Sequence, residues 1–278
     1  MTDPTARLHD GHHIPRIGLG THRLSGEAGT SAMEHALGVG YRLLDTAVNY
    51  GNEVEVGEAL RRSGLPRDEV FVTTKVPGRH HAHADAVASV EGSLERLGLD
   101  RLDLVLVHWP NPSVDRYVEA WRALVDLRER GLTRSIGVSN FTEAHLRRIV
   151  DETGVVPVVN QVELHPRFPQ EQMRAVHDEL DIRTQSWSPL GKHRAAYDDP
   201  AVAGPARTHG VTPAQVILRW HLQIGALPIP KSATPERQRS NLDVLDLELS
   251  DAEVAAITAL GRPEGRLWGG DPDTHEEM

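Results

Sequence analysis

The feature that most constrains the fold of this chain is a regular alternation of short apolar runs with longer segments of helical periodicity. In the clearest run, residues 102–108, four apolar residues from Leu104 to Val107 follow one another without a polar interruption, as in a strand that is buried on both faces. Apolar residues recur at helical spacing on either side, at Val87, Val90, Leu94 and Leu97 before the run and at Tyr117, Trp121, Leu124 and Leu127 after it. This alternation favours βαβ units around a parallel sheet.

Extending the same pattern along the chain predicts eight strands, each followed by a helix, which is the α/β order of a (β/α)₈ TIM barrel. We expect the strands at residues 17–20, 42–45, 70–75, 102–108, 135–139, 158–161, 183–187 and 227–230. We expect the helices at residues 31–39, 53–63, 84–97, 115–129, 143–151, 170–179, 213–223 and 235–241. One barrel accounts for a chain of 278 residues, so we predict a single domain over residues 1–278.

Two further elements are expected at the ends of the chain. Asp10-Gly11 lies between two short segments, which indicates an N-terminal β-hairpin that would plug the floor of the barrel. Ser250 with Glu253 three residues later has the pattern of a capping box, which predicts an extra C-terminal helix packed outside the barrel.

The charge and residue content exclude several classes of function. The net charge is -10 and the basic residues are scattered, so a nucleic acid is not an expected partner. The chain has no cysteine, which excludes disulfides and a thiolate nucleophile and suits a reducing, cytoplasmic compartment. The first residues lack the pattern of an export signal and no apolar run is long enough to cross a bilayer, so no membrane contact is expected.

Polar or reactive residues follow most of the predicted strands, at the ends where barrel enzymes place their sites. They are Asp45, Lys75, His108, Ser139, Asn140, Gln161, Trp187, Lys231 and Ser232. Strand ends are often polar simply because they leave the core, and this explanation suffices for any single residue. It is less satisfactory for an aspartate, a lysine and a histidine that each follow an otherwise apolar strand.

Together with a nearby tyrosine, these residues could protonate a carbonyl oxygen. A phenol has a pKa of about 10 in water and is a poor proton donor near neutrality unless a cation stabilises its phenolate. We expect Lys75 to supply that cation and lower the pKa of Tyr50, and Asp45 to keep Lys75 charged and oriented. A neutral His108 would donate a hydrogen bond to the substrate oxygen. The alternative is a structural Asp–Lys ion pair with a packing tyrosine, but buried pairs are weak stabilisers.

Other motifs give no support to a different chemistry. The glycine pair at positions 18 and 20 begins like a dinucleotide-binding fingerprint, but Arg23 occupies the position of the third glycine. The imidazoles of His80, His81 and His83 are expected in a solvated loop rather than around a cation, so no metal site is predicted.

Seven ordered segments resemble the successive motifs of the aldo-keto reductases. They are GYRLLDTAVNYGNE, VFVTTKVPG, LVLVHWPNP, RSIGVSNF, VVNQVELHP, QSWSPLG and LPIPKSATPERQRSNLDV. The match extends from about Leu8 to Asp246. Trp187 and the short C-terminal segment are similar to those of the bacterial 2,5-diketo-D-gluconate reductase branch of that family.

This resemblance implies a TIM barrel that binds NADPH in an extended form and reduces an aldehyde or ketone to the alcohol. It implies a catalytic tetrad of Asp45, Tyr50, Lys75 and His108. It further implies that Ser139, Asn140 and Gln161 hold the nicotinamide and that Trp187 stacks on its ring. The other implied cofactor contacts are Gly20, Thr21, Ser188, Leu190, Lys231, Ser232, Thr234, Arg237 and Asn241. An arginine can grip a phosphate with two parallel hydrogen bonds, which favours NADPH over NADH.

Two positions depart from the family pattern. Ser240 stands where the family usually has a glutamate that binds the adenine amine, so a weaker grip on the cofactor is expected. His22 stands at the substrate wall where relatives often carry an aromatic or apolar residue. The other expected pocket residues are Val48, Asn49 and Trp109.

The segment after Leu260 is short and polar, which predicts an open, wettable pocket for a small polar carbonyl such as a keto sugar or a dicarbonyl. A broad-specificity aldehyde-detoxifying reductase is an alternative in the same class. A NADPH-binding sensor or structural protein with little turnover is an alternative in another class, because barrel folds do not dictate function. We expect the protein to be a monomer.

Overall fold

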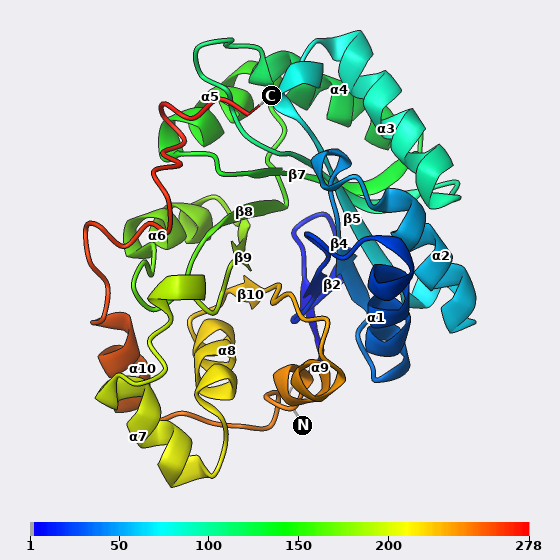
Figure 1. Ribbon diagram of the computed structural model, residues 1–278. Coiled ribbons are helices and arrows are strands. Elements are labelled where there is room, and N and C mark those ends of the chain that lie inside the picture. Colours follow the sequence, from blue (N-terminus) through cyan, green and yellow to red (C-terminus); the bar gives the residue numbers. More distant parts are fainter. Residues whose placement is uncertain (1–2, 278) are drawn as a thin grey trace.

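Eight parallel strands lie side by side in chain order, and their sheet curls into a barrel (Figure 1). The computed structural model describes residues 3–277. The strands are β3 (Leu19–Gly20), β4 (Leu43–Asp45), β5 (Phe71–Val76), β6 (Leu102–Val107), β7 (Thr133–Ser139), β8 (Val159–Glu163), β9 (Arg183–Trp187) and β10 (Leu227–Pro228). Gly18 N donates to Pro228 O at 3.1 Å and Gly20 N donates to Pro230 O at 3.3 Å, so the first and last strands meet. The predicted TIM barrel is confirmed.

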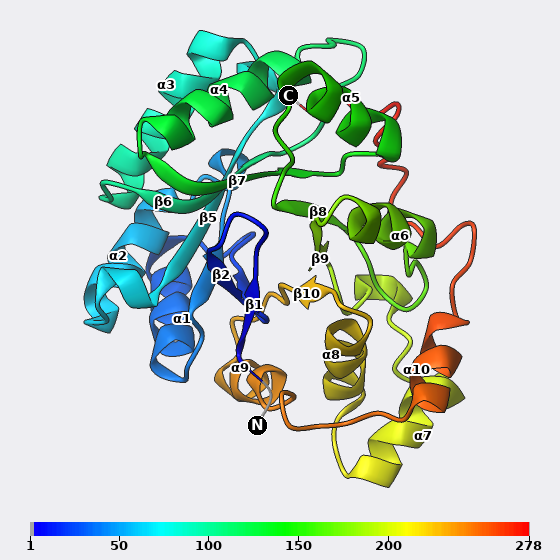
Figure 2. The same cartoon turned by 180° about the vertical axis from the view of Figure 1, so that it is seen from behind.

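Helices surround the strands on the outside of the barrel (Figures 1 and 2). The eight that follow the strands are α1 (Gly26–Gly38), α2 (Glu53–Ser63), α3 (His83–Leu97), α4 (Tyr117–Glu129), α5 (Glu143–Thr153), α6 (Glu171–Glu179), α8 (Pro213–Gln223) and α9 (Pro235–Leu242). Short 3-10 helices are η1 (Val48–Tyr50), η2 (Arg67–Glu69), η3 (Gly78–His80) and η4 (Lys192–Arg194). The extra C-terminal helix is α10 (Asp251–Thr258), and its capping box is present as predicted.

One helix, α7 (Pro200–His209), was not predicted. Its sequence contains an internal proline, Pro205, and a glycine, Gly204, both of which disfavour a helix interior. Its first turn compensates, because Asp199 accepts a hydrogen bond from Ala201 N and a proline occupies the first turn. Packing of its Val202 into an apolar cluster with α8 completes the stabilisation.

The strand β6 shows why its sequence is apolar throughout. Leu104 and Leu106 pack inside the barrel, whereas Val105 and Val107 pack against the helices, and all four are fully buried. A parallel strand in a barrel has no solvent face, so apolar side chains are needed on both sides.

The N-terminal hairpin plugs the barrel floor. It consists of β1 (Thr5–Arg7) and β2 (His13–Pro15), which pair in antiparallel fashion. Leu8 and Ile14 are fully buried and join the apolar cluster of the barrel interior with Leu43 and Leu104. The hairpin therefore fills the end of the barrel opposite the carboxyl ends of the strands.

The segment after α10, residues 261–277, will be called the tail. It is the red trace that leaves α10, passes α6 and reaches the neighbourhood of α5 in both views (Figures 1 and 2). This course carries the tail to the carboxyl ends of the strands. Within residues 3–277, none of the helices combines the length and apolarity needed to cross a bilayer.

Candidate active site

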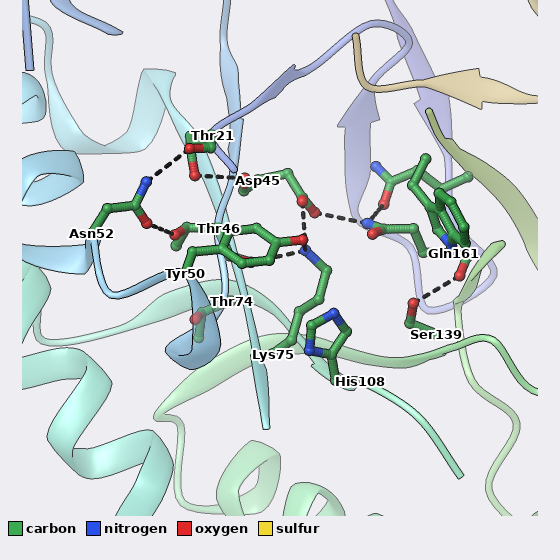
Figure 3. A network of polar contacts seen from close by, with 12 residues as sticks. Thr21, Asp45, Thr46, Tyr50, Asn52, Thr74, Lys75, His108, Ser139 and Gln161 are labelled. Atoms are coloured by element: carbon green, nitrogen blue, oxygen red, sulfur yellow. Dashed lines mark hydrogen bonds and ion pairs between the residues drawn. The ribbon is translucent and has the colours of Figure 1, made fainter. Parts of the chain in front are cut away.

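A lysine, a carboxylate and a phenol meet where β4 and β5 end (Figure 3). Lys75 Nζ lies 2.5 Å from Asp45 Oδ1, 2.9 Å from Thr46 O and 3.4 Å from Tyr50 OH. Asp45 is the last residue of β4, Lys75 lies near the end of β5, and Tyr50 belongs to η1. Lys75 is 0% exposed and Asp45 is 1% exposed. The three side chains therefore form a compact cluster whose ion pair is buried and whose phenol is partly exposed.

Burial and neighbouring charges have opposite effects on the pKa values of Lys75 and Tyr50. Burial lowers the pKa of Lys75, but the charges of Asp45 and then Tyr50 outweigh it, so the pKa is raised and the ammonium persists. For Tyr50, burial raises the pKa, the charge of Lys75 lowers it, and the charge of Asp45 raises it again. The net direction is upward, so the expected lowering of the pKa of Tyr50 is wrong. Sequence reasoning counted the neighbouring cation and omitted the desolvation of the phenol.

His108 faces the phenol from the end of β6. Its ring centroid lies 6.0 Å from that of Tyr50, with the two planes at 74°. The backbone is fixed to the neighbouring strand, because His108 N donates to Val76 O at 3.0 Å. On the tail side, His108 Nδ1 lies 2.7 Å from Glu277 Oε1. This close contact lacks the geometry of a regular hydrogen bond.

A buried asparagine that sequence reasoning missed fastens the loops around the tyrosine. Asn52 Nδ2 donates to Thr21 O and to Leu24 O, both at 2.8 Å, and Asn52 Oδ1 accepts from Thr46 Oγ1 at 2.8 Å. These bonds tie the loop after β3 to the loop that carries Tyr50. The only sequence signal was an amide side chain immediately before a helix, which more often indicates a helix cap.

The residues implied for the nicotinamide form a connected polar group. Gln161 Nε2 donates to Asp45 Oδ2 at 2.7 Å and to Gln185 Oε1 at 2.7 Å. Ser139 Oγ donates to Gln161 O at 2.8 Å, and Asn140 Nδ2 donates to Ser139 Oγ at 3.0 Å. Trp187 Nε1 donates to Asn140 Oδ1 at 2.8 Å. Both amide hydrogens of Gln161 are thus donated to protein groups, so its carbonyl oxygen can accept a hydrogen bond from an amide ligand.

The residues implied for the far end of the cofactor gather before α9. Lys231, Thr234 and Arg237 are exposed, Ser232 is buried, and Ser232 Oγ accepts from Thr234 N at 3.1 Å. Two cations, two hydroxyls and the start of an eight-residue helix suit the oxygens of a phosphate. Gly20 packs closely against the end of the last strand, because a side chain there would begin 2.9 Å from Ile229 O.

The other implied cofactor residues differ in how open they are. Ser188 and Leu190 are partly exposed and follow β9, with Ser188 in the left-handed region at φ 50°. Thr21 is fully buried and bonded to Asp45 O. Asn241 is 4% exposed and hydrogen-bonds the hydroxyl of Tyr41, so it is held in the protein interior. Ser240 is partly exposed beside it.

The tail lies against the substrate side of the site, which makes the pocket less open than predicted. The ring of Trp268 lies 5.8 Å from that of Trp109 and 6.3 Å from that of Trp187. His275 lies 4.3 Å from Trp109. Glu277 reaches furthest inward, and Asn49 Nδ2 donates to its Oε1 at 2.8 Å. A tail with few apolar residues can still cover a site when one of them is a large aromatic residue.

Of the remaining expected pocket residues, His22 contacts the phenol. The ring of His22 packs edge-on against Tyr50 at 4.9 Å. Burial, followed by the charges of nearby cations, lowers the pKa of His22 and keeps its ring neutral at pH 7. Val48 and Asn49 belong to η1, on the turn that also carries Tyr50.

One histidine of the predicted solvated loop is instead buried. His81 is 1% exposed, and burial lowers its pKa to about 4. His80 Nδ1 contacts Ser89 Oγ at 3.1 Å and His83 Nε2 contacts Asp126 Oδ2 at 2.8 Å, so each of these two has a protein partner. Among residues 3–277 no group of three or more His, Asp or Glu side chains is arranged to hold a metal ion.

The fold and this site together define a class of protein, namely a β/α-barrel enzyme with a buried lysine–aspartate pair beside a tyrosine at the carboxyl ends of its strands. The model of the Aldo/keto reductase family matches residues 16–262. The chain belongs to the aldo/keto reductase family, as its motifs predicted.

Two curated relatives are similar over nearly their whole length. The 2,5-diketo-D-gluconic acid reductase B of Corynebacterium sp. is 58% identical over 275 residues, which cover 99% of each chain. Methylglyoxal reductase DkgA of Escherichia coli K12 is 44% identical over 275 residues, covering 98% of each chain.

Solved structures agree with the described fold. A variant of Gox0644 in complex with NADPH is similar with a TM-score of 0.94 and 43% identity, covering 99% of both chains. An aldo-keto reductase of Bombyx mori in complex with NADP is similar with a TM-score of 0.91 and 33% identity, covering 99% of this chain and 98% of that one.

Proposed function

We propose that this protein is an NADPH-dependent oxidoreductase that reduces the carbonyl group of a small polar aldehyde or ketone to the alcohol. The observation that carries the proposal is the Tyr50 hydroxyl, 3.4 Å from the Lys75 ammonium that is itself paired with Asp45 at 2.5 Å. The cluster lies at the mouth of a barrel whose family relatives include a structure bound to NADPH.

Four side chains take part in the transfer of one proton to the carbonyl oxygen. Tyr50 keeps its proton at neutral pH and donates it to the carbonyl oxygen as that oxygen becomes basic. Lys75 stabilises the phenolate left behind, and Asp45 holds Lys75 in place. His108 donates a hydrogen bond that orients the carbonyl oxygen. NADPH supplies the hydride when it is bound.

The cofactor-binding roles follow the donor chemistry of the described residues. Ser139, Asn140 and Gln161 would bind the carboxamide of the nicotinamide, and Trp187 would stack on the ring. Ser188 and Leu190 would flank the pyrophosphate, and Gly20 and Thr21 would complete the cofactor site. The phosphate that distinguishes NADPH would bind Lys231, Ser232, Thr234 and Arg237, with Asn241 behind them. The exposed cations support this assignment, because one charge-assisted contact is about twice as strong as a neutral hydrogen bond.

For the substrate we propose a keto sugar acid or a small dicarbonyl. Two similar enzymes carry the names of such compounds, 2,5-diketo-D-gluconic acid and methylglyoxal. The polar side chains of His22 and Asn49 beside the phenol suit hydroxyl-bearing substrates, and Val48 and Trp109 complete the wall. All residues of the proposed site come from one barrel domain, so a monomer suffices, and a chain without cysteine suits the cytoplasm.

The proposal is tested with NADPH deuterated at its transferable position and a panel of dicarbonyls and keto sugars. We expect one NADPH consumed per alcohol formed, with one deuterium on the former carbonyl carbon. If no member of the panel consumes NADPH above the rate without protein, the proposed function is wrong.

A further inference from the structure

The tail delivers a carboxylate to the buried side of His108. Glu277 Oε1 lies 2.7 Å from His108 Nδ1, and the same side chain is fixed by Asn49 Nδ2 at 2.8 Å and by Gly78 N at 3.3 Å. The Glu277 side chain is 13% exposed, and the His108 side chain is 11% exposed. A single residue of the tail therefore joins η1, η3 and the end of β6.

The backbone of the tail is anchored at both ends of its course over the pocket. Leu267 N donates to the buried carboxylate of Glu163 at 2.7 Å. At the far end, Asn111 Nδ2 donates to Glu277 O at 2.5 Å, and Glu277 N donates to Asn111 Oδ1 at 3.2 Å. These contacts fix the position of Glu277, and a side chain that positions a catalytic group must itself be held in a fixed geometry.

The 2.7 Å contact restricts where the protons of His108 can be. A neutral ring has one protonated and one unprotonated nitrogen. If the unprotonated nitrogen were Nδ1, no hydrogen would lie between it and a carboxylate oxygen only 2.7 Å away, and the two electron-rich atoms would repel each other. If it were Nε2, that nitrogen would have no hydrogen to donate to a carbonyl oxygen. Only a doubly protonated ring both satisfies the carboxylate and donates from Nε2.

We propose that Glu277 is a positioning residue for the reduction, which pairs with His108 Nδ1 and keeps the ring doubly protonated so that Nε2–H can donate to the substrate oxygen. This inference rests on the proposed function, and it replaces the expectation of a neutral His108. Burial works to raise the pKa of Glu277, but the contacts with His108, Asn49 and Gly78 outweigh it and lower that pKa, so Glu277 is an anion at neutral pH.

Other charged and titratable groups surround this pair. Tyr50 faces His108 from η1. Lys75 on β5 lies beside Tyr50 and is bonded to Asp45 (Figure 3). His81, after η3, and Glu276, on the tail, interact electrostatically with each other, and Glu277 also acts on His81. The ammonium of Lys75 is matched by Asp45 at 2.5 Å. Glu277 is thus the carboxylate in direct contact with His108.

The kinetic test compares Glu277→Gln with Glu276→Gln, which removes the adjacent tail carboxylate that accepts from Ser113 N and does not contact His108. The value of kcat/KM for methylglyoxal, a substrate without charge, is measured at saturating NADPH from pH 5.5 to 9. In Glu277→Gln, the pH at which kcat/KM falls by half on the alkaline side should be lower than in the parent by at least about one unit. At pH values between the two midpoints, the variant should have about tenfold lower kcat/KM than the parent. The pH profile of Glu276→Gln should superimpose on that of the parent. The inference is overturned if Glu277→Gln superimposes instead, or if both variants shift equally.

A direct measurement separates this inference from the proposed function. With ¹⁵N-labelled histidine, the Nδ1 and Nε2 signals of His108 are assigned by comparison with His108→Asn, and their shifts distinguish a doubly protonated ring from either neutral form. At pH 7.5 we expect a doubly protonated ring in the parent and a neutral ring in Glu277→Gln. A neutral ring in the parent overturns the inference whether or not any carbonyl is reduced.

Discussion

Replacing Asp45 with asparagine should destabilise the barrel strongly, because it leaves the Lys75 ammonium buried without an anion. Asp45 accepts from Lys75 Nζ at 2.5 Å and from Gln161 Nε2 at 2.7 Å, and both ions of the pair are almost fully buried. Asparagine has one acceptor oxygen where aspartate has two, so one donor loses its partner. Removing one member of a buried ion pair costs about 3–5 kcal/mol of the free energy of unfolding. At roughly 2–3 °C per kcal/mol for a chain of this size, the Tm should fall by about 6–15 °C.

The double variant Asp45→Asn with Lys75→Met separates charge from shape. It removes the uncompensated ammonium, so it should regain most of the lost free energy of unfolding while remaining inactive. Urea unfolding followed by tryptophan fluorescence, together with NADPH consumption, measures both properties. If Asp45→Asn unfolds within about 1 kcal/mol of the parent, or if the double variant is no more stable than the single one, the described electrostatics of the pair are wrong.

Two further predictions concern a buried histidine and the cofactor phosphate. Burial lowers the pKa of His221 to about 3, so between pH 6.5 and 3 the unfolded state binds more protons and the free energy of unfolding falls as the pH falls. In His221→Gln this slope, from urea unfolding at several pH values, should be smaller by about 1.4 kcal/mol per pH unit, and an unchanged slope contradicts the assignment. Arg237→Ala should raise the KM for NADPH about tenfold or more and leave the KM for NADH within about twofold. Equal changes in the two KM values would mean that Arg237 does not bind the phosphate that distinguishes NADPH from NADH.

The strands and the polar residues at their ends were predictable because a parallel barrel imposes a strict pattern. Strands that are buried on both faces favour apolar residues, so β6 is recognisable from Leu104 to Val107 alone. Residues that end neighbouring strands converge on one rim, so Asp45 and Lys75 could be paired before any coordinates were known.

Other features were not predictable, because they depend on contacts between parts of the chain far apart in sequence. Pro205 made α7 look unlike a helix, and packing of Val202 against α8 contributes to its stability. The tail has few apolar residues, so the contacts of Trp268 and Glu277 with the site left no periodic signal. The upward pKa of Tyr50 follows from burial, which the identity of its neighbours does not reveal.

The central claim is that the hydroxyl of Tyr50 gives its proton to the reduced carbonyl. The most direct measurement is single-turnover NADPH consumption by Tyr50→Phe, with NADPH binding measured separately by quenching of tryptophan fluorescence. We predict a dissociation constant for NADPH within about twofold of the parent and a rate of the chemical step lower by a factor of at least about 100. A variant that binds NADPH normally and still reduces the carbonyl at near the parent rate would contradict the account.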